Sequence, residues 1–169
     1  MAPLVRRTWA PKGQTPFLYQ KTRSHQKVSM IAALTAPPVR RRIGLYFSLH
    51  SNANITSKLL AGFLRNLARH LQKPMLVLWD RSRIHRSKLI RRFLQNHRRC
   101  AVASFPAYAP ELNPVESFWS YLKKNPLANF APKDTQSLSR RARYHSHRIS
   151  HRSSLLRSFL HATPLFLPT

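Results

Sequence analysis

Residues 104–124 read SFPAYAPELNPVESFWSYLKK, which predicts a proline-stiffened loop that leads into a helix. Asn113 suits the cap of that helix, and Pro114 suits its first position because the missing N–H would have no partner there. Apolar residues then recur at i, i+3, i+4 and i+7, the spacing of a helix face laid on a core. They are Val115, Phe118, Trp119 and Leu122.

Two acidic residues near this helix each have a functional and a purely structural interpretation. Glu116 lies beside the apolar face, where it can border a cleft, but Asn113-x-x-Glu116 also has nearly the spacing of a capping box. Asp80 directly follows the apolar run 75–79, and ligand sites in open α/β sheets gather at the carboxyl ends of strands. Asp is equally common in the turns that follow strands. Spacing alone leaves both interpretations open.

Three segments carry a resemblance to a known family: LWDRSRIH at 78–85, FPAYAPELNPVE at 105–116 and WSYLK at 119–123. They resemble the DDE transposases of bacterial insertion sequences related to mariner elements. The resemblance implies a ribonuclease-H-like α/β fold, a mixed sheet flanked by helices, that cleaves and transfers DNA strands at transposon ends. It also implies that Asp80 and Glu116 are catalytic, as the second and third acids of a triad that binds Mg²⁺ or Mn²⁺.

The chain departs from this family in two places. Arg81 stands where the family usually has Asn, which puts a fixed positive charge beside the expected metal site. Residues 1–79 contain no acidic residue, so the first acid of the triad is missing. We therefore expect an N-terminally truncated catalytic domain over residues 1–130, with its first strand shortened or absent. A basic helical segment over residues 131–169 should pack on the same domain, and the chain alone should be inactive.

The remaining candidates are weaker. Glu111 lies in the same loop as Glu116 and is the second choice as a ligand, whereas Asp134 suits a helix cap. His85 matches a histidine common in the family, which implies a role in orienting a phosphate or a water; a half-buried, hydrogen-bonded histidine is the plain alternative. The histidines near the C-terminus lack an acidic or cysteine companion and are interpreted as part of a solvated basic face: His145, His147 and His151.

The charge of the chain predicts its partner. Thirty Lys and Arg face four Asp and Glu, a net charge of +26, which attracts polyanions and favours DNA. Further candidate partners are the upstream transposase segment and a homodimer partner, and the resemblance places the protein on DNA in a bacterial cytoplasm. The residues expected to contact nucleic acid are Arg81, His85, Arg86, Lys123, Lys124, Arg140, Arg141, Arg143, Arg148 and Arg152.

Other classes are excluded or kept as alternatives. The single cysteine, Cys100, excludes an internal disulfide framework, and no apolar run reaches the roughly 18 residues that span a bilayer. One alternative is a basic nucleic-acid-binding protein without chemistry, in which Asp80 and Glu116 only cap turns and helices. Another is a degenerate reading frame whose product is not under selection.

The hydrophobic pattern predicts a series of elements before and after the opening stretch. Trp79 and Trp119 have apolar neighbours and are expected in the core. The expected elements are an antiparallel strand pair over 27–35 and 41–49 with a bulge at Gly44, a helix over 55–72 capped by Asn54 or Thr56, a buried strand over 75–79, a helix over 86–97, a strand over 100–104 and one final helix from Asp134 to about 160.

Overall fold

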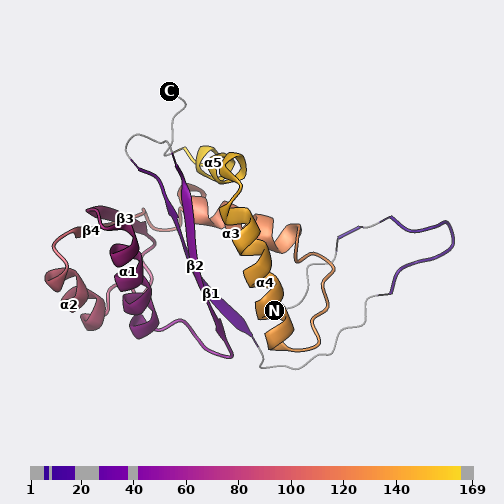
Figure 1. Ribbon diagram of the computed structural model, residues 1–169, viewed down its shortest axis with the longest axis horizontal. Coiled ribbons are helices and arrows are strands. Elements are labelled where there is room, and N and C mark those ends of the chain that lie inside the picture. Colours follow the sequence, from indigo (N-terminus) through magenta and orange to yellow (C-terminus); the bar gives the residue numbers. More distant parts are fainter. Residues whose placement is uncertain (1–5, 8, 18–26, 38–41, 165–169) are drawn as a thin grey trace.

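The computed structural model describes the chain except residues 1–5, 8, 18–26, 38–41 and 165–169. Two consecutive strands come first, helices and strands then alternate, and helices alone follow (Figure 1). The elements are β1 (Val28–Thr35), β2 (Gly44–Ser51), α1 (Ser57–Leu71), β3 (Met75–Trp79), α2 (Lys88–Asn96), β4 (Cys100–Ser104), the 3₁₀ helix η1 (Pro110–Leu112), α3 (Pro114–Lys124), α4 (Thr135–Ser150) and α5 (Ser153–His161).

The strands form two separate pairs. β1 pairs antiparallel with β2, from Val28 opposite Ser51 to Thr35 opposite Gly44. β3 pairs parallel with β4, from Met75 opposite Cys100 onward. Within the described residues the two pairs are not hydrogen-bonded to each other, so the sheet is divided into two two-stranded pieces.

The described register shows no bulge at Gly44, because it runs without interruption from Val28 opposite Ser51 to its last pair, Thr35 opposite Gly44. The glycine is required for close approach instead. A Cβ at this position would lie 2.7 Å from Thr35 Oγ1 and 2.9 Å from Tyr46 Cε2, so a larger residue would push against both neighbours.

A first core cluster lies between the β1–β2 pair and helices α3, α4 and α5. Phe118 from α3 and Leu156 from α5 are fully buried at its centre, with Leu122 and Ile149 beside them. Alternate residues of β1 pack against this cluster, as the period of a strand requires: Met30, Ala32 and Leu34. The C-terminal helices thus share one core with the strands, while a domain division at residue 130 stays a prediction.

A second core cluster lies under α1 and α2. Leu60 and Leu64 of α1 meet Ile90 and Phe93 of α2, with Cys100 at the start of β4. Partly buried residues from both strand pairs complete it: Ile31 of β1 and Met75, Val77 and Trp79 of β3. The β1–β2 pair therefore has apolar cover on both faces.

The β3–β4 pair is covered on one face only, so the expectation of a buried strand over 75–79 holds for one face and is wrong for the other. Residues of β3 alternate between partly buried and exposed, and Leu76 and Leu78 are 64% and 45% exposed. The apolar composition of the run predicted burial but did not tell one face from the other. Within the described residues, no helix covers the face that carries these two leucines.

The final helix is two helices, which corrects the expectation of one helix to about residue 160. α4 ends at Ser150, whose hydroxyl donates to the carbonyl of His147 at 2.7 Å, and the Arg152 N–H turns back to Ile149 O at 2.9 Å. The break redirects α5, so that Phe159 and Leu160 reach the first core cluster. One straight helix would carry them away from it.

Helix starts agree with the predicted caps. Thr56, and not Asn54, caps α1 by accepting a hydrogen bond from the Leu59 N–H at 3.3 Å. Asn113 caps α3 through the Val115 N–H at 3.2 Å, with Pro114 as the first helical residue. No helix in the described part of the chain is both long and apolar enough to cross a membrane.

Candidate functional site

Asp80 stands directly after the last residue of β3, where the sequence placed it. The strand end is fixed by the Phe105 N–H, which donates to Trp79 O at 2.8 Å. One carboxylate oxygen of Asp80, Oδ1, accepts a hydrogen bond from the Ser82 N–H at 2.9 Å, which is the geometry of an Asp-initiated turn. The side chain remains 68% exposed. Asp80 therefore shapes the turn and still presents a carboxylate to solvent.

His85 is held by Asp80 and by the preceding tryptophan. Its Nδ1 lies 2.9 Å from Asp80 Oδ1 and 2.9 Å from the Asp80 carbonyl oxygen. The imidazole stacks on the Trp79 ring at 4.4 Å between centroids and 7° between planes. Because both neighbours of Nδ1 are oxygen acceptors, Nδ1 carries a proton, which leaves Nε2 as the free end of the ring. The half-buried, hydrogen-bonded histidine is what the structure shows.

Glu116 lies in the first turn of α3 and is exposed. The capping box that offered its structural interpretation does not form. In a capping box the glutamate would accept a hydrogen bond from the Asn113 N–H. Here that N–H donates to Pro110 O at 3.0 Å instead. Within the described residues the Glu116 carboxylate makes no hydrogen bond or ion pair, so the helix cap does not consume it.

The other two acids have separate positions. Glu111 lies on η1 and is exposed. Asp134 caps α4 in a capping box, accepting from the Ser137 N–H at 2.6 Å while the Asp134 N–H donates to the Ser137 hydroxyl at 3.3 Å. The hydrogen bond from the Ser137 N–H, and then the one from its side chain, hold the pKa of Asp134 below its usual value. Asp134 is thus the helix cap that the sequence predicted.

These groups are not gathered into one cluster of metal ligands within the described residues. No three His, Cys, Asp or Glu side chains in the described part of the chain are placed to share a metal ion. One Asp80 oxygen already serves Ser82 and His85, and the neighbouring Arg81 donates from Nε to Phe105 O at 3.2 Å. Two divalent cations about 3.5–4 Å apart need more anionic ligands than this. That Asp80 and Glu116 face one cleft stays a prediction.

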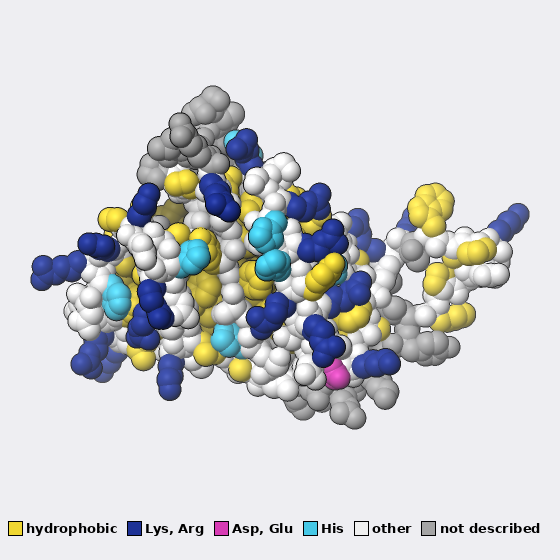
Figure 2. Space-filling view, in the orientation of Figure 1, with side chains coloured by type: hydrophobic (Ala, Val, Ile, Leu, Met, Phe, Trp, Pro, Cys, Tyr) yellow, Lys and Arg dark blue, Asp and Glu magenta, His cyan; other side chains and the backbone are white. Residues whose placement is uncertain are grey.

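The cationic surface of the described residues is extensive. Figure 2 shows Lys and Arg side chains spread across the visible face with very little Asp or Glu among them. The one contact of ion-pair length among the described residues joins His85 to Asp80, so no described Lys or Arg side chain pairs with a carboxylate. The arginines expected to contact nucleic acid on and after α4 are exposed: Arg140, Arg141, Arg143, Arg148 and Arg152.

Several of these arginines lie on aromatic rings. The Arg141 guanidinium is 4.7 Å from the centroid of Phe130, and that of Arg148 is 5.8 Å from the centroid of Tyr144. Arg152 donates from Nη1 to the Tyr121 hydroxyl at 3.4 Å. Such contacts steady the guanidinium groups without neutralising them, because an aromatic ring carries no net charge. The charges remain available to phosphates.

The histidines near the C-terminus are not all alike. His147 and His151 are exposed, with their Nε2 atoms 3.4 Å apart, as expected for one turn of a basic face. His145 differs, because burial and then the neighbouring Arg141 and Arg148 lower its pKa. Both causes favour the neutral form of the His145 ring.

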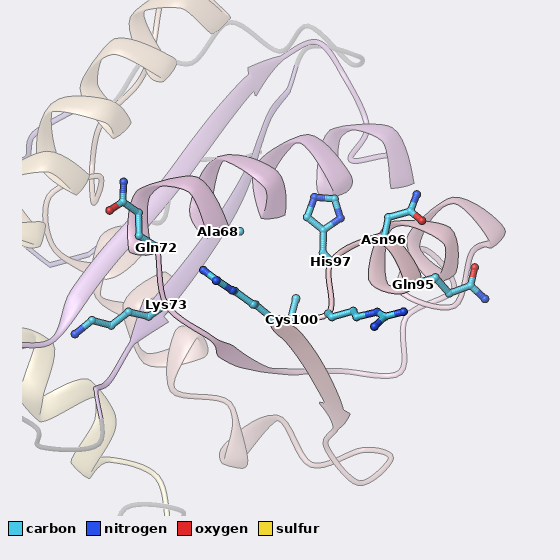
Figure 3. A pocket seen from close by; sticks show the side chains of 9 residues that line it. Ala68, Gln72, Lys73, Gln95, Asn96, His97 and Cys100 are labelled. Carbon is cyan, nitrogen blue, oxygen red and sulfur yellow. The ribbon is translucent and has the colours of Figure 1, made fainter.

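A second basic feature was missed from the sequence. A hollow of about 560 Å³ lies where α1 and α2 end and β4 begins (Figure 3). Its lining includes Lys73, which lies far in the sequence from the other two cations, Arg98 and Arg99, together with side-chain amides from the C-cap of α1 and from α2. The hollow borders the amino ends of β3 and β4, whereas Asp80 follows the carboxyl end of β3. The two sites are thus at opposite ends of the same strand pair.

Comparisons with known proteins identify the architecture. A family model described as DDE superfamily endonuclease matches residues 2–139. Solved structures of the Mos1 strand transfer complex, the Mos1 mariner paired end complex with Mn and the Mos1 transposase paired-end complex with the left transposon end are each 17% identical in sequence, with TM-scores of 0.67, 0.66 and 0.68. A search among curated proteins gives no match.

The structural matches cover 96% of this chain but 48% of each Mos1 chain, so the chain spans about half the length of the solved structures it resembles. The fold class predicted from the sequence, ribonuclease-H-like α/β with helices around a mixed sheet, is confirmed by this likeness. The divided sheet of this chain is the fold's strand layer in two pieces.

Proposed function

Because this chain belongs to the DDE superfamily endonucleases, we propose that it is the DNA-binding C-terminal part of a transposase catalytic domain and does not cut DNA by itself. The observation that carries the proposal is the distribution of acids: a family match begins at residue 2, yet the first acidic residue of the chain is Asp80. A triad built on this chain lacks one of its three carboxylates.

The reaction of a complete enzyme would be strand cleavage and transfer at transposon ends, as in the mariner-related transposases of bacterial insertion sequences. Mg²⁺ or Mn²⁺ would supply charge stabilisation of an in-line phosphoryl transfer there. Asp80 and Glu116, as exposed carboxylates from two different elements, are the two ligands this chain would contribute. His85 would orient the Asp80 carboxylate through its Nδ1 proton.

What this chain does alone is bind DNA. Its net charge is +26, and within the described residues no carboxylate neutralises the arginines of α4. Phosphates would supply the missing negative charge and release their counterions, which gives affinity without base readout. The partners proposed with DNA are the upstream transposase segment and a second copy, in a bacterial cytoplasm.

The test is a nicking assay. Purified protein is incubated with Mg²⁺ or Mn²⁺ and DNA that bears the ends of the element, and products are separated on a denaturing gel. We expect binding in a parallel gel-shift assay and no nicking. Robust nicking that Glu116→Gln abolishes would show that another group completes the site, and the proposal would be wrong.

A nucleic-acid-binding protein without any metal function is the second candidate, and the use of Asp80 in the turn and in holding His85 favours it. Titration of Mn²⁺ into the protein, followed by calorimetry or electron paramagnetic resonance, separates the two. Binding that is weakened by both Asp80→Asn and Glu116→Gln supports a residual transposase site. No detectable binding, or binding that neither variant changes, supports the second candidate.

A further inference from the structure

We propose that the ring of Tyr108 stacks on an unpaired base of the DNA that this chain binds, beside the strand end that carries Asp80. The inference deepens the proposed function and rests on it, because a base can stack here only when DNA is bound. Contact with the face of a base differs in kind from the phosphate contacts expected of the arginines on and after α4.

Tyr108 lies in the loop between β4 and η1, and its side chain is wholly in solvent. It is 102% exposed, so both faces of the ring are open. Aromatic rings usually bury much of their surface in a core or an interface, because their apolar area stabilises the protein only when it leaves water. An open aromatic ring is also the group on which nucleic-acid bases stack. The exposure therefore points to a flat, apolar occupant.

The backbone of Tyr108 is as unusual as its side chain. Its φ of 57° lies in the left-handed region, which bulky residues rarely adopt. Two of the other three described non-glycine residues with positive φ are Asn52 and Asn129, and asparagine enters this region more easily. Glycine would adopt it without strain. The chain thus places an aromatic ring where a glycine would fold more easily, and such strained positions cluster at ligand sites.

The loop that carries the ring is anchored. Phe105 at its start is buried, and its carbonyl accepts a hydrogen bond from Arg81 Nε at 3.2 Å, which ties the loop to the turn after β3. Pro106 and Pro110 lie on either side of Tyr108 and fix their own φ angles. The η1 helix follows at once. The ring is therefore presented from a short, constrained segment, which lowers the ordering cost of a contact.

The loop begins at the end of the strand pair where Asp80 lies. Trp79 pairs with Ser104 in parallel strands, so Asp80 and the loop leave the same edge. Tyr108 is four residues beyond Ser104, and four residues span at most about 14 Å. Stacked nucleotides are about 3.4 Å apart along one strand, so about four of them cover this distance. One DNA strand can therefore contact both the turn at Asp80 and the ring of Tyr108.

The neighbouring charges favour a nucleic acid over a protein as the occupant. The turn over residues 80–87 contains three exposed arginines, against the carboxylates of Asp80 in the turn and Glu111 on η1. Phosphates bind arginines and bring bases with them, and every base has a flat face that stacks on an aromatic ring. The arginines are Arg81, Arg83 and Arg86.

The test compares two single-stranded oligonucleotides that carry the same number of phosphates. One has ordinary bases with a single 2-aminopurine, whose fluorescence is quenched by stacking, and the other is abasic throughout. The variants are Tyr108→Gly, which removes the ring and relieves the backbone, and Tyr108→Trp, which keeps a ring. Trp9→Ala is the matched control, because Trp9 is also fully exposed and lies outside the loop. Fluorescence anisotropy gives Kd over a range of salt.

We expect the protein to bind the strand with bases more tightly than the abasic strand, by about 5- to 150-fold for one stacked base. Tyr108→Gly should remove this preference and the quenching, while Tyr108→Trp and Trp9→Ala keep both. The slope of log Kd against log salt should be the same in Tyr108→Gly, because no phosphate contact is lost. Its urea midpoint should not fall, since glycine accepts a positive φ.

Other outcomes overturn the inference. A preference that survives Tyr108→Gly would mean that another group contacts the base, and an equal loss in Trp9→Ala would mean that exposed rings act without regard to position. A lower urea midpoint and a changed salt slope in Tyr108→Gly would assign the ring a structural role. Equal, salt-dependent binding of both strands would leave the proposed function standing and leave the ring to a protein partner. Absence of binding to either strand at low salt would mean that the proposed function itself fails.

Discussion

The two strand pairs differ in how they are covered, although both are rich in apolar residues. The β1–β2 pair lies between two core clusters, and Phe118 and Leu156 beside it are fully buried. The β3–β4 pair has a core on one face and carries Leu76 and Leu78 in solvent on the other. Apolar strand residues are thus buried in the β1–β2 pair and partly exposed in the β3–β4 pair. The difference arises because burial of a strand depends on which helices pack on it.

The largest expected effect concerns whether DNA binds on the side of the β1–β2 pair, through the arginines on and after α4. If roughly 6–10 phosphates are contacted, affinity should fall by about 10³–10⁵ between 50 and 200 mM salt. Replacing Arg140, Arg141, Arg143, Arg148 and Arg152 by Ala should lower the slope of log Kd against log salt by up to about 4.5, if each contacts a phosphate. Fluorescence anisotropy on random-sequence DNA measures both. An affinity that stays flat with salt would contradict the electrostatic account.

The next effect sharpens the contrast in cover. Phe118→Ala removes a fully buried ring from the first core cluster and should cost about 3–5 kcal/mol of unfolding free energy. Leu76→Ala, on the exposed face of β3, should change it by less than about 0.5 kcal/mol. Urea denaturation followed by circular dichroism gives both values. Equal losses would mean that the β3 face is covered in solution.

A smaller effect is expected at the hollow beside the β3–β4 pair. Replacing Lys73, Arg98 and Arg99 by Ala should lower the salt slope by up to about 2.7 if each contacts a phosphate. The unfolding free energy should hardly change, because all three side chains are exposed. Lys88→Ala on α2, also exposed and outside the hollow, is the matched control. A slope that the triple variant leaves unaltered would exclude the hollow from the DNA interface.

The smallest effect is a pH dependence of the stability of α4, which packs on the β1–β2 pair. Asp134 has a lowered pKa because of the Ser137 N–H, so its contribution to stability is present above the ordinary carboxyl pKa of about 3.9 and is lost as pH falls through the lowered value. Asp134→Asn keeps a capping oxygen and should remove this dependence. Hydrogen exchange of α4 at pH 5 and pH 3 compares the two proteins. An unaltered pH response in the variant would show that a group other than Asp134 causes the effect.

Local signals in the sequence predicted most elements and their caps. Asn113, Pro114 and the stripe from Val115 to Leu122 predicted α3 because each signal acts within one or two helical turns. Asp80 was placed at a strand end, and His85 was singled out five residues later, although the 2.9 Å contact between them was not foreseen.

Properties that depend on distant parts of the chain were not predicted. An apolar run such as MLVLW looks buried on both faces whether or not a helix covers it, so the exposure of Leu76 and Leu78 had no local signal. The hollow brings Lys73 together with Arg98 and Arg99 only after α1 and α2 have packed. The break after Ser150 follows from where α5 finds its core, which a helical pattern alone does not reveal.

Alkylation of Cys100 can serve as a probe of the β3–β4 pair. Cys100 is the only cysteine of the chain, and it is buried at the start of β4. An alkylating reagent attacks the thiolate, and burial both raises the thiol pKa and restricts access from the hollow that Cys100 helps to line, so local opening should speed the reaction. The rate of alkylation should therefore rise when the region around Cys100 opens. A ligand that contacts both strand pairs would lower the rate of alkylation, even without contacting the sulfur.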